Sequence, residues 1–307
     1  MTQPRRHEPL PLGGEHGLPY SKGMMARALI AVGVDPARAY AVAERLERDL
    51  QARGRDVAEL ERLDELASEI LGDEEGASVV RQLRRFRELR ELEIPIIVLV
   101  GGATGTGKST VATEAAYRLG ITRVTSTDFV RQTMRAFFSR EFMPSIHHSS
   151  FEAGKALPAE EQETGDPVLL GFLEQTRNVN VGVRASIERA LEEGWSMVLE
   201  GVHVVPGMLP TRYAGALVIQ CILHIAEEAH HEAHFLIRDA SSDERRPTSK
   251  YLDHFGEIRR IQRYIVDRAR RTGVPVIENT DVAKATADVI ELVVSAAERV
   301  RETETVP

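Results

Sequence analysis

One short segment of this chain, residues 102–109, constrains its fold more than any other feature. The segment reads Gly-Ala-Thr-Gly-Thr-Gly-Lys-Ser, which matches the pattern G-x-x-x-x-G-K-[ST]. A continuous apolar run at residues 96–100 precedes it, as expected of a strand covered on both faces, and a helical pattern begins near Lys108. Glycines in such a loop let backbone N–H groups converge on a phosphate chain, and the following helix N-terminus adds positive potential. The segment is therefore predicted to be a P-loop that binds nucleotide phosphates, and not a chance glycine-rich turn.

The positions of this loop have distinct expected roles. Lys108 is expected to reach the β- and γ-phosphates, and the hydroxyl of Ser109 is expected to ligate Mg²⁺. ATP and Mg²⁺ are thus the expected nucleotide and metal ion. The predicted nucleotide-binding residues are Gly102, Thr104, Gly105, Thr106, Gly107, Lys108, Ser109 and Thr110.

Strand and helix patterns alternate after residue 94 but not before it. Residues 21–92 carry helix signals only, such as the N-cap Asp35 followed by Pro36 at the first helical position. Downstream, the strands are expected at 96–100, 123–126, 197–199, 217–223 and 276–278. Helices between these strands imply a parallel sheet with right-handed crossovers. The predicted fold class is α/β: a P-loop NTPase-type parallel sheet flanked by helices and preceded by a small all-helical N-terminal domain.

The expected domain limits follow from this change of pattern. They are 1–17 for a flexible N-terminus, 18–92 for the helical domain and 93–303 for the P-loop domain.

Charge and cysteine content narrow the expected partners and compartment. The chain has 39 Lys and Arg against 47 Asp and Glu, and a net charge of −8 matches a nucleic-acid polyanion poorly. Its single cysteine, Cys221, excludes an intrachain disulfide. No apolar run approaches the roughly 20 residues that span a bilayer, and residues 1–11 lack the apolar core of a signal peptide. We therefore expect a cytoplasmic protein with a small anionic substrate and neither nucleic-acid nor membrane partners.

The P-loop indicates a nucleotide but leaves the reaction open. A Ras-type GTPase would carry N-K-x-D after a late strand, and the segment 278–281, Glu-Asn-Thr-Asp, does not fit. Motor and remodelling ATPases usually end the third strand in paired acids, whereas this chain has the single acid Glu200 there. Small-molecule kinases place acids at strand ends and an Arg-rich lid late in the chain. This sequence has both features, which favours a phosphotransferase.

Two strand-end acids are candidates for the chemistry. Asp128 follows the second predicted strand, which is expected beside the P-loop strand, and its place at a carboxyl end faces the ligand crevice. It could act as general base toward an acceptor hydroxyl or hold a water on Mg²⁺, and the alternative is an N-cap for the next helix. Glu200 is similarly placed on the third strand, where a metal-water or substrate role is favoured over a structural carboxylate.

A polar segment, residues 238–250, is the candidate lid. It breaks helical periodicity between two helical patterns, and arginines that closure brings in can neutralise a transferring phosphoryl group. The alternative is a solvated surface loop. The expected catalytic arginines are Arg238, Arg245 and Arg246.

Two further motifs are weaker. His230 and His234 have i,i+4 spacing, but the zinc motif H-E-x-x-H would need Glu where His231 stands, so packed or solvent-facing histidines are favoured. The basic stretch 81–90 keeps apolar residues at helical spacing, which favours a solvated helix face over an RNA-binding surface.

Several of these motifs, in this order, make the chain resemble the 2-phosphoglycerate kinases. They are the P-loop at 101–109, Thr-Ser-Thr-Asp at 125–128 with Arg131 and Arg135, Pro-Ser-Ile-His-His-Ser-Ser at 144–150, Leu-Glu-Gly-Val-His at 199–203 with Pro206-Gly207, and Lys-Tyr-Leu at 250–252 with Ile-Arg-Arg-Ile-Gln at 258–262. The helical front resembles a nucleotide cone, although it would serve equally as a dimerisation surface in a homo-oligomer.

The resemblance implies ATP-dependent phosphorylation of 2-phosphoglycerate at its free hydroxyl, giving 2,3-bisphosphoglycerate. A substrate with a carboxylate and a phosphate needs fixed cations, which Arg131, Arg135 and the lid arginines could supply. The remaining expected substrate-binding residues are His147, Ser149, Glu200 and His203, of which the histidines and the serine could also be structural. Two alternatives stay open: a kinase of an inositol or sugar phosphate, and a non-catalytic ATP-sensing regulator.

Overall fold

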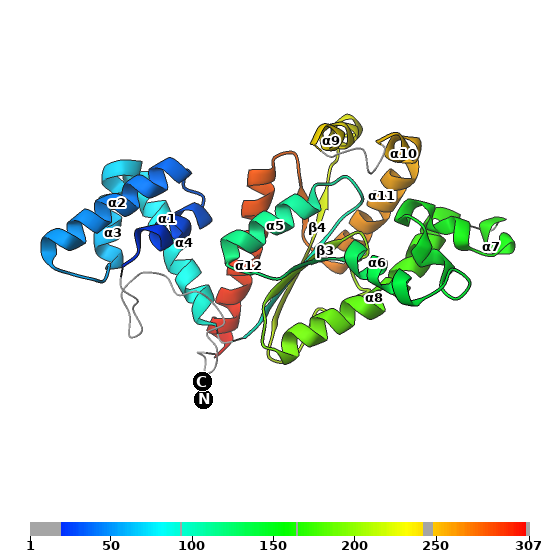
Figure 1. The fold of residues 1–307 in the computed structure, drawn as a ribbon, viewed down its shortest axis with the longest axis horizontal. Helices are drawn as coiled ribbons and strands as arrows, with labels where there is room; N and C mark the ends of the chain where they lie inside the picture. The colour runs from blue at the N-terminus through cyan, green and yellow to red at the C-terminus, as the bar shows by residue number, and fades with distance from the viewer. Residues whose placement is uncertain (1–19, 93, 164, 242–247, 305–307) are drawn as a thin grey trace. The chain divides into compact units, whose positions relative to one another are not determined.

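The structure, a computed structural model, describes residues 20–92, 94–163, 165–241 and 248–304 (Figure 1). It divides into two compact units. The first comprises Met1–Glu93, Tyr117–Ile121 and Val293–Pro307, and the second comprises Ile94–Ala116 and Thr122–Leu292. The expected domain limits at 92 and 303 stay a prediction.

The first unit is built from helices, which agrees with the predicted helical front. The helices that lie wholly within it are α1 (Lys22–Ala31), α2 (Pro36–Arg53), α3 (Leu60–Leu71) and α4 (Asp73–Glu91). The expected cap forms at α2, where Oδ1 of Asp35 accepts hydrogen bonds from the N–H groups of Ala37 and Arg38 at 3.0 and 3.2 Å. The helices bury one apolar cluster that includes Leu29, Leu46, Leu63, Leu66 and Leu83. The apolar residues of each helix recur every three or four positions and form one apolar face. The helices are therefore held together mainly by the packing of these faces.

The second unit contains a sheet of five parallel strands. They are β1 (Ile96–Gly101), β2 (Val124–Ser126), β3 (Met197–Gly201), β4 (Leu217–His224) and β5 (Val276–Glu278). All six residues of β1 are buried, as the unbroken apolar run predicted. The predicted parallel sheet of P-loop type is thus confirmed.

The strand order corrects one expectation. The order is β2-β3-β1-β4-β5, so the second strand does not lie beside the P-loop strand as expected. β3 lies between them, with Glu200 opposite Val100 of β1 and opposite Ser126 of β2. The reason is burial: all five residues of β3 are buried, which suits the centre of a sheet, whereas the three residues of β2 are exposed or half-buried and suit an edge.

Helices connect and cover these strands. They are α5 (Lys108–Leu119), α6 (Thr127–Phe137), η1 (Pro144–His147), η2 (Ser150–Ala156), α7 (Ala159–Glu163), α8 (Pro167–Glu192), α9 (Glu228–Ser241), α10 (Thr248–Asp253), α11 (Phe255–Thr272) and α12 (Val282–Glu304). One buried cluster joins β1 and β3 to α6 and α8, and another joins β4 to α9 and α11.

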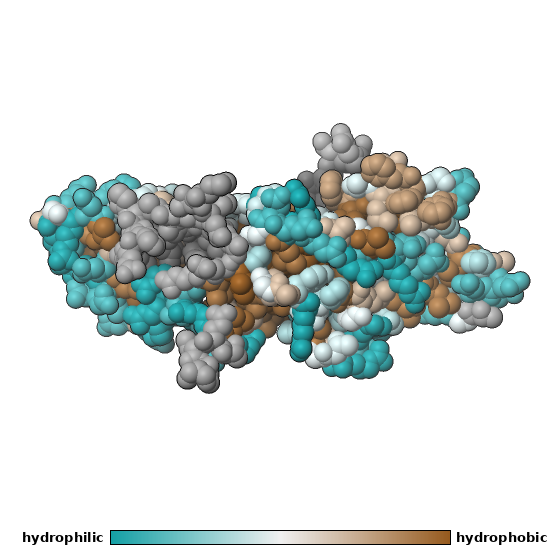
Figure 2. Space-filling model, turned by 90° about the horizontal axis from the view of Figure 1, so that it is seen from below, coloured by the Kyte–Doolittle hydropathy of each residue, from teal (hydrophilic) through white to brown (hydrophobic). Residues whose placement is uncertain are grey.

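Apolar side chains also reach the surface of the second unit. Figure 2 shows brown apolar patches among hydrophilic residues on one side of the molecule. Phe129, Phe137 and Phe142 are 67%, 79% and 70% exposed. Among the described residues, no helix combines the length and apolar character that crossing a membrane requires.

Candidate active site

The loop between β1 and α5 has the backbone that its glycines allow. Gly102, Gly105 and Gly107 have φ angles of 149°, 86° and 75°, a region that other residues rarely adopt. Space excludes side chains as well: a Cβ would lie 2.3 Å from the Phe235 ring at Gly105 and 2.4 Å from the Asn279 amide nitrogen at Gly107. The loop therefore needs glycine at these positions for two independent reasons.

Lys108 and Ser109 begin α5 at the inner edge of this loop. In this structure Nζ of Lys108 donates a hydrogen bond to the carbonyl oxygen of Ala103 at 3.2 Å. The hydroxyl of Ser109 donates to Oε1 of Glu200 at 3.0 Å. Glu200 is only 7% exposed and is the penultimate residue of β3, so the sheet holds its carboxylate against the start of α5. The two predicted metal-site residues are thus adjacent.

A hydroxyl and a carboxylate are ligands of the kind that Mg²⁺ prefers. No group of three or more His, Cys, Asp or Glu side chains that could hold a metal ion occurs in the part of the chain that the structure describes. Mg²⁺ in phosphate sites usually takes one or two protein ligands and completes its shell with phosphate oxygens and water. The pair Ser109 and Glu200 fits that pattern.

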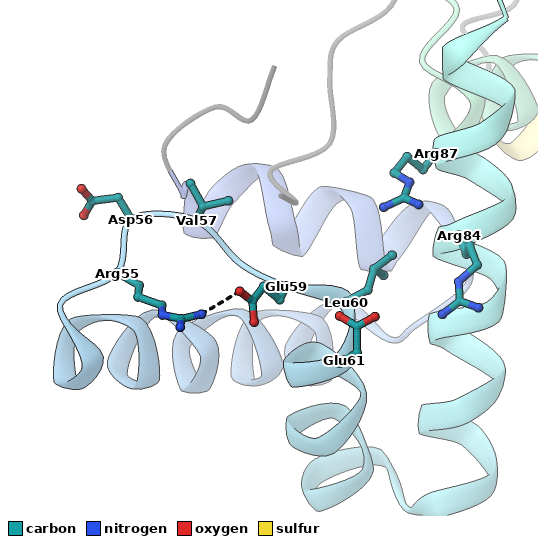
Figure 3. A pocket seen from close by; sticks show the side chains of 8 residues that line it. All are labelled: Arg55, Asp56, Val57, Glu59, Leu60, Glu61, Arg84 and Arg87. Atoms are coloured by element: carbon teal, nitrogen blue, oxygen red, sulfur yellow. Dashed lines mark hydrogen bonds and ion pairs between the residues drawn. The ribbon is translucent and has the colours of Figure 1, made fainter. Parts of the chain in front are cut away.

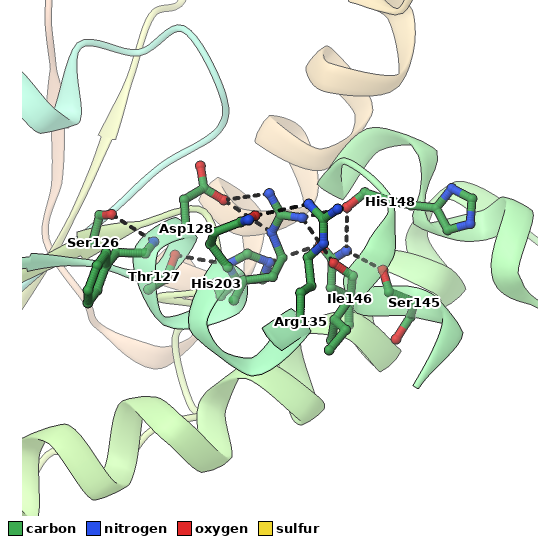
Figure 4. Close-up of polar contacts among 12 residues, drawn as sticks. Ser126, Thr127, Asp128, Arg135, Ser145, Ile146, His148 and His203 are labelled. Carbon is green, nitrogen blue, oxygen red and sulfur yellow. Dashed lines mark hydrogen bonds and ion pairs between the residues drawn. The ribbon is translucent and has the colours of Figure 1, made fainter. Parts of the chain in front are cut away.

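Asp128 lies in the first turn of α6, just after β2 (Figure 4). It is not the N-cap of this helix, because the side chain of Ser126 accepts the hydrogen bond from the N–H of Phe129 at 3.0 Å. The Asp128 side chain is 58% exposed, and its Oδ1 lies 3.4 Å from both Nε and Nη2 of Arg131. The alternative of a plain N-cap is therefore wrong, and the carboxylate is accessible to a ligand.

Charges around Asp128 favour its ionised form. Partial burial raises the pKa of Asp128, whereas charge on His203, Arg131 and Lys108 lowers it, and the net direction is downward. Burial lowers the pKa of His203 to about 3, so this ring is neutral near pH 7. Arg131 and Lys108 therefore carry the effect under neutral conditions, and they keep Asp128 a carboxylate.

His203 is fully buried and has protein partners at both ring nitrogens. Its Nε2 lies 2.9 Å from Oε1 of Gln175, and its Nδ1 lies 2.8 Å from the hydroxyl of Thr127. The amide nitrogen of Gln175 donates to the carbonyl oxygens of Ser145 and His148 at 2.6 and 3.0 Å, so Oε1 is the atom that faces His203. His203 therefore carries its proton on Nε2 and accepts from Thr127 at Nδ1. This geometry favours a structural role for His203 over direct contact with a substrate.

Arg131 joins α6 to η1. Its Nη1 donates to the carbonyl oxygens of Ile146 and His148 at 3.0 and 2.9 Å, and its side chain is only 15% exposed. The same guanidinium therefore contacts Asp128 and fixes the segment around residues 146–148. The predicted substrate residue Arg131 thus lies beside the predicted base.

Three other predicted substrate-binding residues, Arg135, His147 and Ser149, have different contacts. Arg135 donates from Nη1 to Oε1 of Gln132 at 3.0 Å, while its buried Nε has no hydrogen-bond partner in the described residues. Nε2 of His147 lies 3.0 Å from the carbonyl oxygen of Phe138. Ser149 precedes η2 and makes no side-chain capping hydrogen bond. These contacts leave substrate roles for the three residues as predictions.

The lid arginines can be placed only in part. Arg245 and Arg246 lie outside the described residues, and of Arg238 the structure describes the backbone, within α9. Beyond this segment, Lys250 of α10 forms an ion pair with Glu152 of η2. Glu152 belongs to no motif that predicts a role from sequence. Its pKa is lowered to about 2: partial burial raises the pKa, but hydrogen bonds and charge from Lys155 and Lys250 outweigh that effect.

A pocket in the first unit has a mixed charge. Its lining is drawn in Figure 3 and comprises Arg55, Asp56, Val57, Glu59, Leu60, Glu61, Arg84 and Arg87. Arg55 is paired with Glu59 at 2.6 Å. Three acids and three arginines line the pocket, so it does not present a uniform anion site. The likeness of this unit to a nucleotide cone stays a prediction.

Several relatives that carry the name 2-phosphoglycerate kinase are similar to this chain along most of its length. The 2-phosphoglycerate kinase of Methanothermobacter thermautotrophicus is 41% identical over 280 residues, covering 91% of this chain and 91% of the relative. That of Pyrococcus furiosus is 38% identical over 278 residues, covering 91% and 90%. That of Thermococcus kodakarensis is 37% identical over 273 residues, covering 89% and 92%.

No family model matches the chain. A solved structure of a gluconokinase from Sinorhizobium meliloti covers 69% of this chain and 95% of its own, with a TM-score of 0.32 and 13% sequence identity.

Proposed function

This chain belongs to the 2-phosphoglycerate kinase family, and we propose that it transfers the γ-phosphoryl group of ATP to the free hydroxyl of 2-phosphoglycerate, giving 2,3-bisphosphoglycerate and ADP. The observation that carries the proposal is the 41% identity across 91% of both this chain and a relative of that name. The P-loop and the strand-end carboxylates of the second unit supply groups suited to the reaction.

Lys108 and the P-loop would bind the phosphates of ATP. Among the described residues Nζ of Lys108 hydrogen-bonds only to one carbonyl oxygen, so within that part of the chain it can turn toward the β- and γ-phosphates without breaking an ion pair. Its charge would then lie where negative charge develops as the phosphoryl group transfers. Removal of Lys108 should therefore affect the transition state more than the fold.

Ser109 and Glu200 would hold Mg²⁺, directly or through water. The distance of 3.0 Å between Oγ and Oε1 supports this role, because both oxygens already converge on one point beside the loop. When bound, Mg²⁺ would neutralise charge on the β- and γ-phosphate oxygens. Glu200 is the one acid in β3, and its burial gives its orientation little freedom.

Asp128 would accept a hydrogen bond, and then the proton, from the acceptor hydroxyl of the substrate. Its lowered pKa leaves it ionised at neutral pH, so it can accept a hydrogen bond from the hydroxyl and take the proton as the new P–O bond forms. Arg131 contacts the same carboxylate and limits its orientation. A weak base is sufficient here, because positioning and charge stabilisation dominate phosphoryl transfer.

Arginines would bind the carboxylate and phosphate of the acceptor. Arg131 already uses two N–H groups on carbonyls, whereas the buried Nε of Arg135 has no partner in the described residues and is the better candidate for an anion contact. Contributions from Arg238, Arg245, Arg246, His147 and Ser149 remain proposals from the sequence.

The test is coupled ADP release from purified protein with Mg-ATP and a panel of acceptors. The panel comprises 2-phosphoglycerate, 3-phosphoglycerate, glycerate and inositol monophosphates. Turnover that needs 2-phosphoglycerate and is absent in Lys108→Ala would support the proposal. Turnover with another acceptor alone would overturn the substrate but keep the reaction class. ATP binding without turnover on any acceptor would favour a nucleotide sensor.

A further inference from the structure

The outward carbonyl groups of the P-loop are held by side chains from two distant parts of the chain. Nε2 of His231 lies 2.8 Å from the carbonyl oxygen of Thr104, and Nδ2 of Asn279 lies 2.8 Å from that of Thr106. His231 belongs to α9, and Asn279 follows β5. These contacts cross 127 and 173 residues of sequence. Neither residue is expected to touch the phosphates, because both lie on the side of the loop to which its carbonyls point.

Because the peptide group is planar, these contacts to carbonyl oxygens also orient the N–H groups that follow them. The carbonyl of one residue and the N–H of the next lie in one plane and point in opposite directions. A donor that fixes the Thr104 carbonyl therefore also fixes the N–H of Gly105, and a donor on Thr106 fixes the N–H of Gly107. In the described residues neither of these two N–H groups donates a hydrogen bond to the protein. They are free for the anion that a P-loop binds.

We propose that His231 and Asn279 are positioning residues of the P-loop, which orient the N–H groups of Gly105 and Gly107 toward the nucleotide phosphates. The inference rests on the proposed use of a nucleotide by this loop. It gives the histidine-rich start of α9 a role other than the metal motif that its spacing suggests.

The surroundings of His231 select the tautomer that this role needs. Its ring is fully buried, stacks on Phe235 at 5.5 Å between centroids and meets the edge of Phe255 at 5.4 Å. Nη1 of Arg259 lies 3.5 Å from Nδ1, while the same guanidinium donates to the carbonyl oxygen of Ile225 at 2.7 Å. Because a guanidinium only donates, Nδ1 faces it without a proton and Nε2 carries the hydrogen toward Thr104. Burial also lowers the pKa of His231 to about 4, which keeps the ring neutral.

Asn279 is equally constrained. It is 1% exposed, its backbone N–H donates to the carbonyl oxygen of His224 at 2.8 Å, and its amide nitrogen fills the space above Gly107. A carbonyl oxygen only accepts, so the amide presents Nδ2 to Thr106. This residue stands in the segment where a GTPase would read its base, and here it supports the phosphate loop instead.

His234 adds a weaker contact of the same kind. Its Nδ1 lies 3.2 Å from the carbonyl oxygen of Gly105, one helical turn from His231. The N–H that follows, that of Thr106, turns back inside the loop toward the carbonyl oxygen of Ala103 at 3.4 Å. His234 therefore shapes the turn, and the two anion-facing N–H groups depend on His231 and Asn279.

The test compares donor-free and donor-keeping variants in calorimetric titrations with Mg-ADP. His231→Phe keeps an aromatic ring beside Phe235 but has no donor, and we expect it to bind Mg-ADP about tenfold more weakly, the loss of one well-placed hydrogen bond. His231→Gln retains an N–H donor and should recover affinity to within about threefold of wild type. His230→Phe, on the exposed face of the same helix, is the matched control and should bind as wild type.

Two outcomes would overturn the proposal. One is wild-type affinity in folded His231→Phe; the other is an equal loss in His231→Phe and His231→Gln, which would indicate packing alone. Asn279→Leu and Asn279→Gln make the same comparison at the second contact, and decide the matter should the Phe variant not fold. Mg-ADP binding involves no acceptor, so a wrong acceptor assignment would leave this comparison unaffected.

Discussion

The hydroxyl of Ser109 donates a hydrogen bond to the carboxylate of Glu200 over 3.0 Å, joining the first turn of α5 to the end of β3. The contact spans 91 residues of sequence. It depends on the strand order, because β3 lies directly beside the strand that leads into the P-loop. Were β2 in that place, Glu200 would be one strand further from Ser109.

Replacing Glu200 by Gln should separate its charge from its shape. The amide keeps an oxygen that can accept from Ser109 but removes the negative charge, so the concentration of Mg²⁺ needed for half-maximal turnover should rise roughly 10- to 100-fold. Turnover measured across a Mg²⁺ titration checks this. Glu278→Gln, an exposed acid at the end of β5, is the control and should leave the Mg²⁺ dependence unchanged. An unchanged titration in Glu200→Gln would contradict the metal role.

Lys108→Ala should lower kcat by at least about 10²- to 10³-fold, since one preorganised cationic donor to the transferring group is lost. In the part of the chain that the structure describes, the side chain makes one hydrogen bond, to Ala103, so the melting temperature should change little. Steady-state turnover and thermal unfolding on the same sample check both parts. A variant that keeps its full turnover would exclude the proposed mechanism.

Substitutions of Asp128 and Ser126 should differ in their effects, the first acting mainly on turnover and the second mainly on stability. Asp128→Asn removes the proposed base and should lower kcat by about 10²-fold or more, with only a small loss of stability because the Asp128 side chain that pairs with Arg131 is 58% exposed. Ser126→Ala removes the cap of α6 and should cost about 1 kcal/mol of unfolding free energy while kcat stays near wild type. Kinetics and denaturant unfolding of the pair distinguish the two roles; the reverse pattern would show that Asp128 is structural.

The stability of the protein should fall in mild acid because of His203. Burial lowers its pKa from 6.5 to about 3, so below about pH 6.5 the unfolded chain binds a proton that the native state does not. The native state therefore loses stability as the pH falls from about 6.5 toward about 3, by roughly 2 kcal/mol at pH 5. His203→Gln lacks this proton, so its unfolding free energy should depend less on pH over the same range. Equal pH slopes for the variant and wild type would contradict the assignment.

The sequence predicted those features that depend on short-range patterns. The P-loop, the buried strand before it and the capped helix after Asp35 were all recognisable from spacing, because each uses residues within one or two turns of one another. The residues of the P-loop itself lie together for the same reason. The strand-end position of Glu200 was also recognisable, since an apolar run ends there.

Features that depend on distant partners were not predictable in this way. The place of β3 between β1 and β2 follows from which strands are buried on both faces, and the alternation of strands and helices does not encode that order. The N-cap alternative for Asp128 stayed open from sequence, because Ser126 and Asp128 are both good capping residues near the start of α6 and only the structure shows that Ser126 is the cap. The buried polar residue Gln175 carried no local signal, since it lies in the middle of a long helix.

The crowding around Gly105 and Gly107 has an entropic consequence. A loop whose glycines lie against Phe235 and Asn279, and whose outward carbonyls are already bonded, has few conformations to lose when an anion arrives. A flexible loop would lose conformational entropy on binding, and this loss would weaken its affinity for the anion. The preordered loop avoids most of that loss and so binds more tightly. Association then needs no prior rearrangement of the loop, so its rate is limited by diffusion and orientation of the nucleotide.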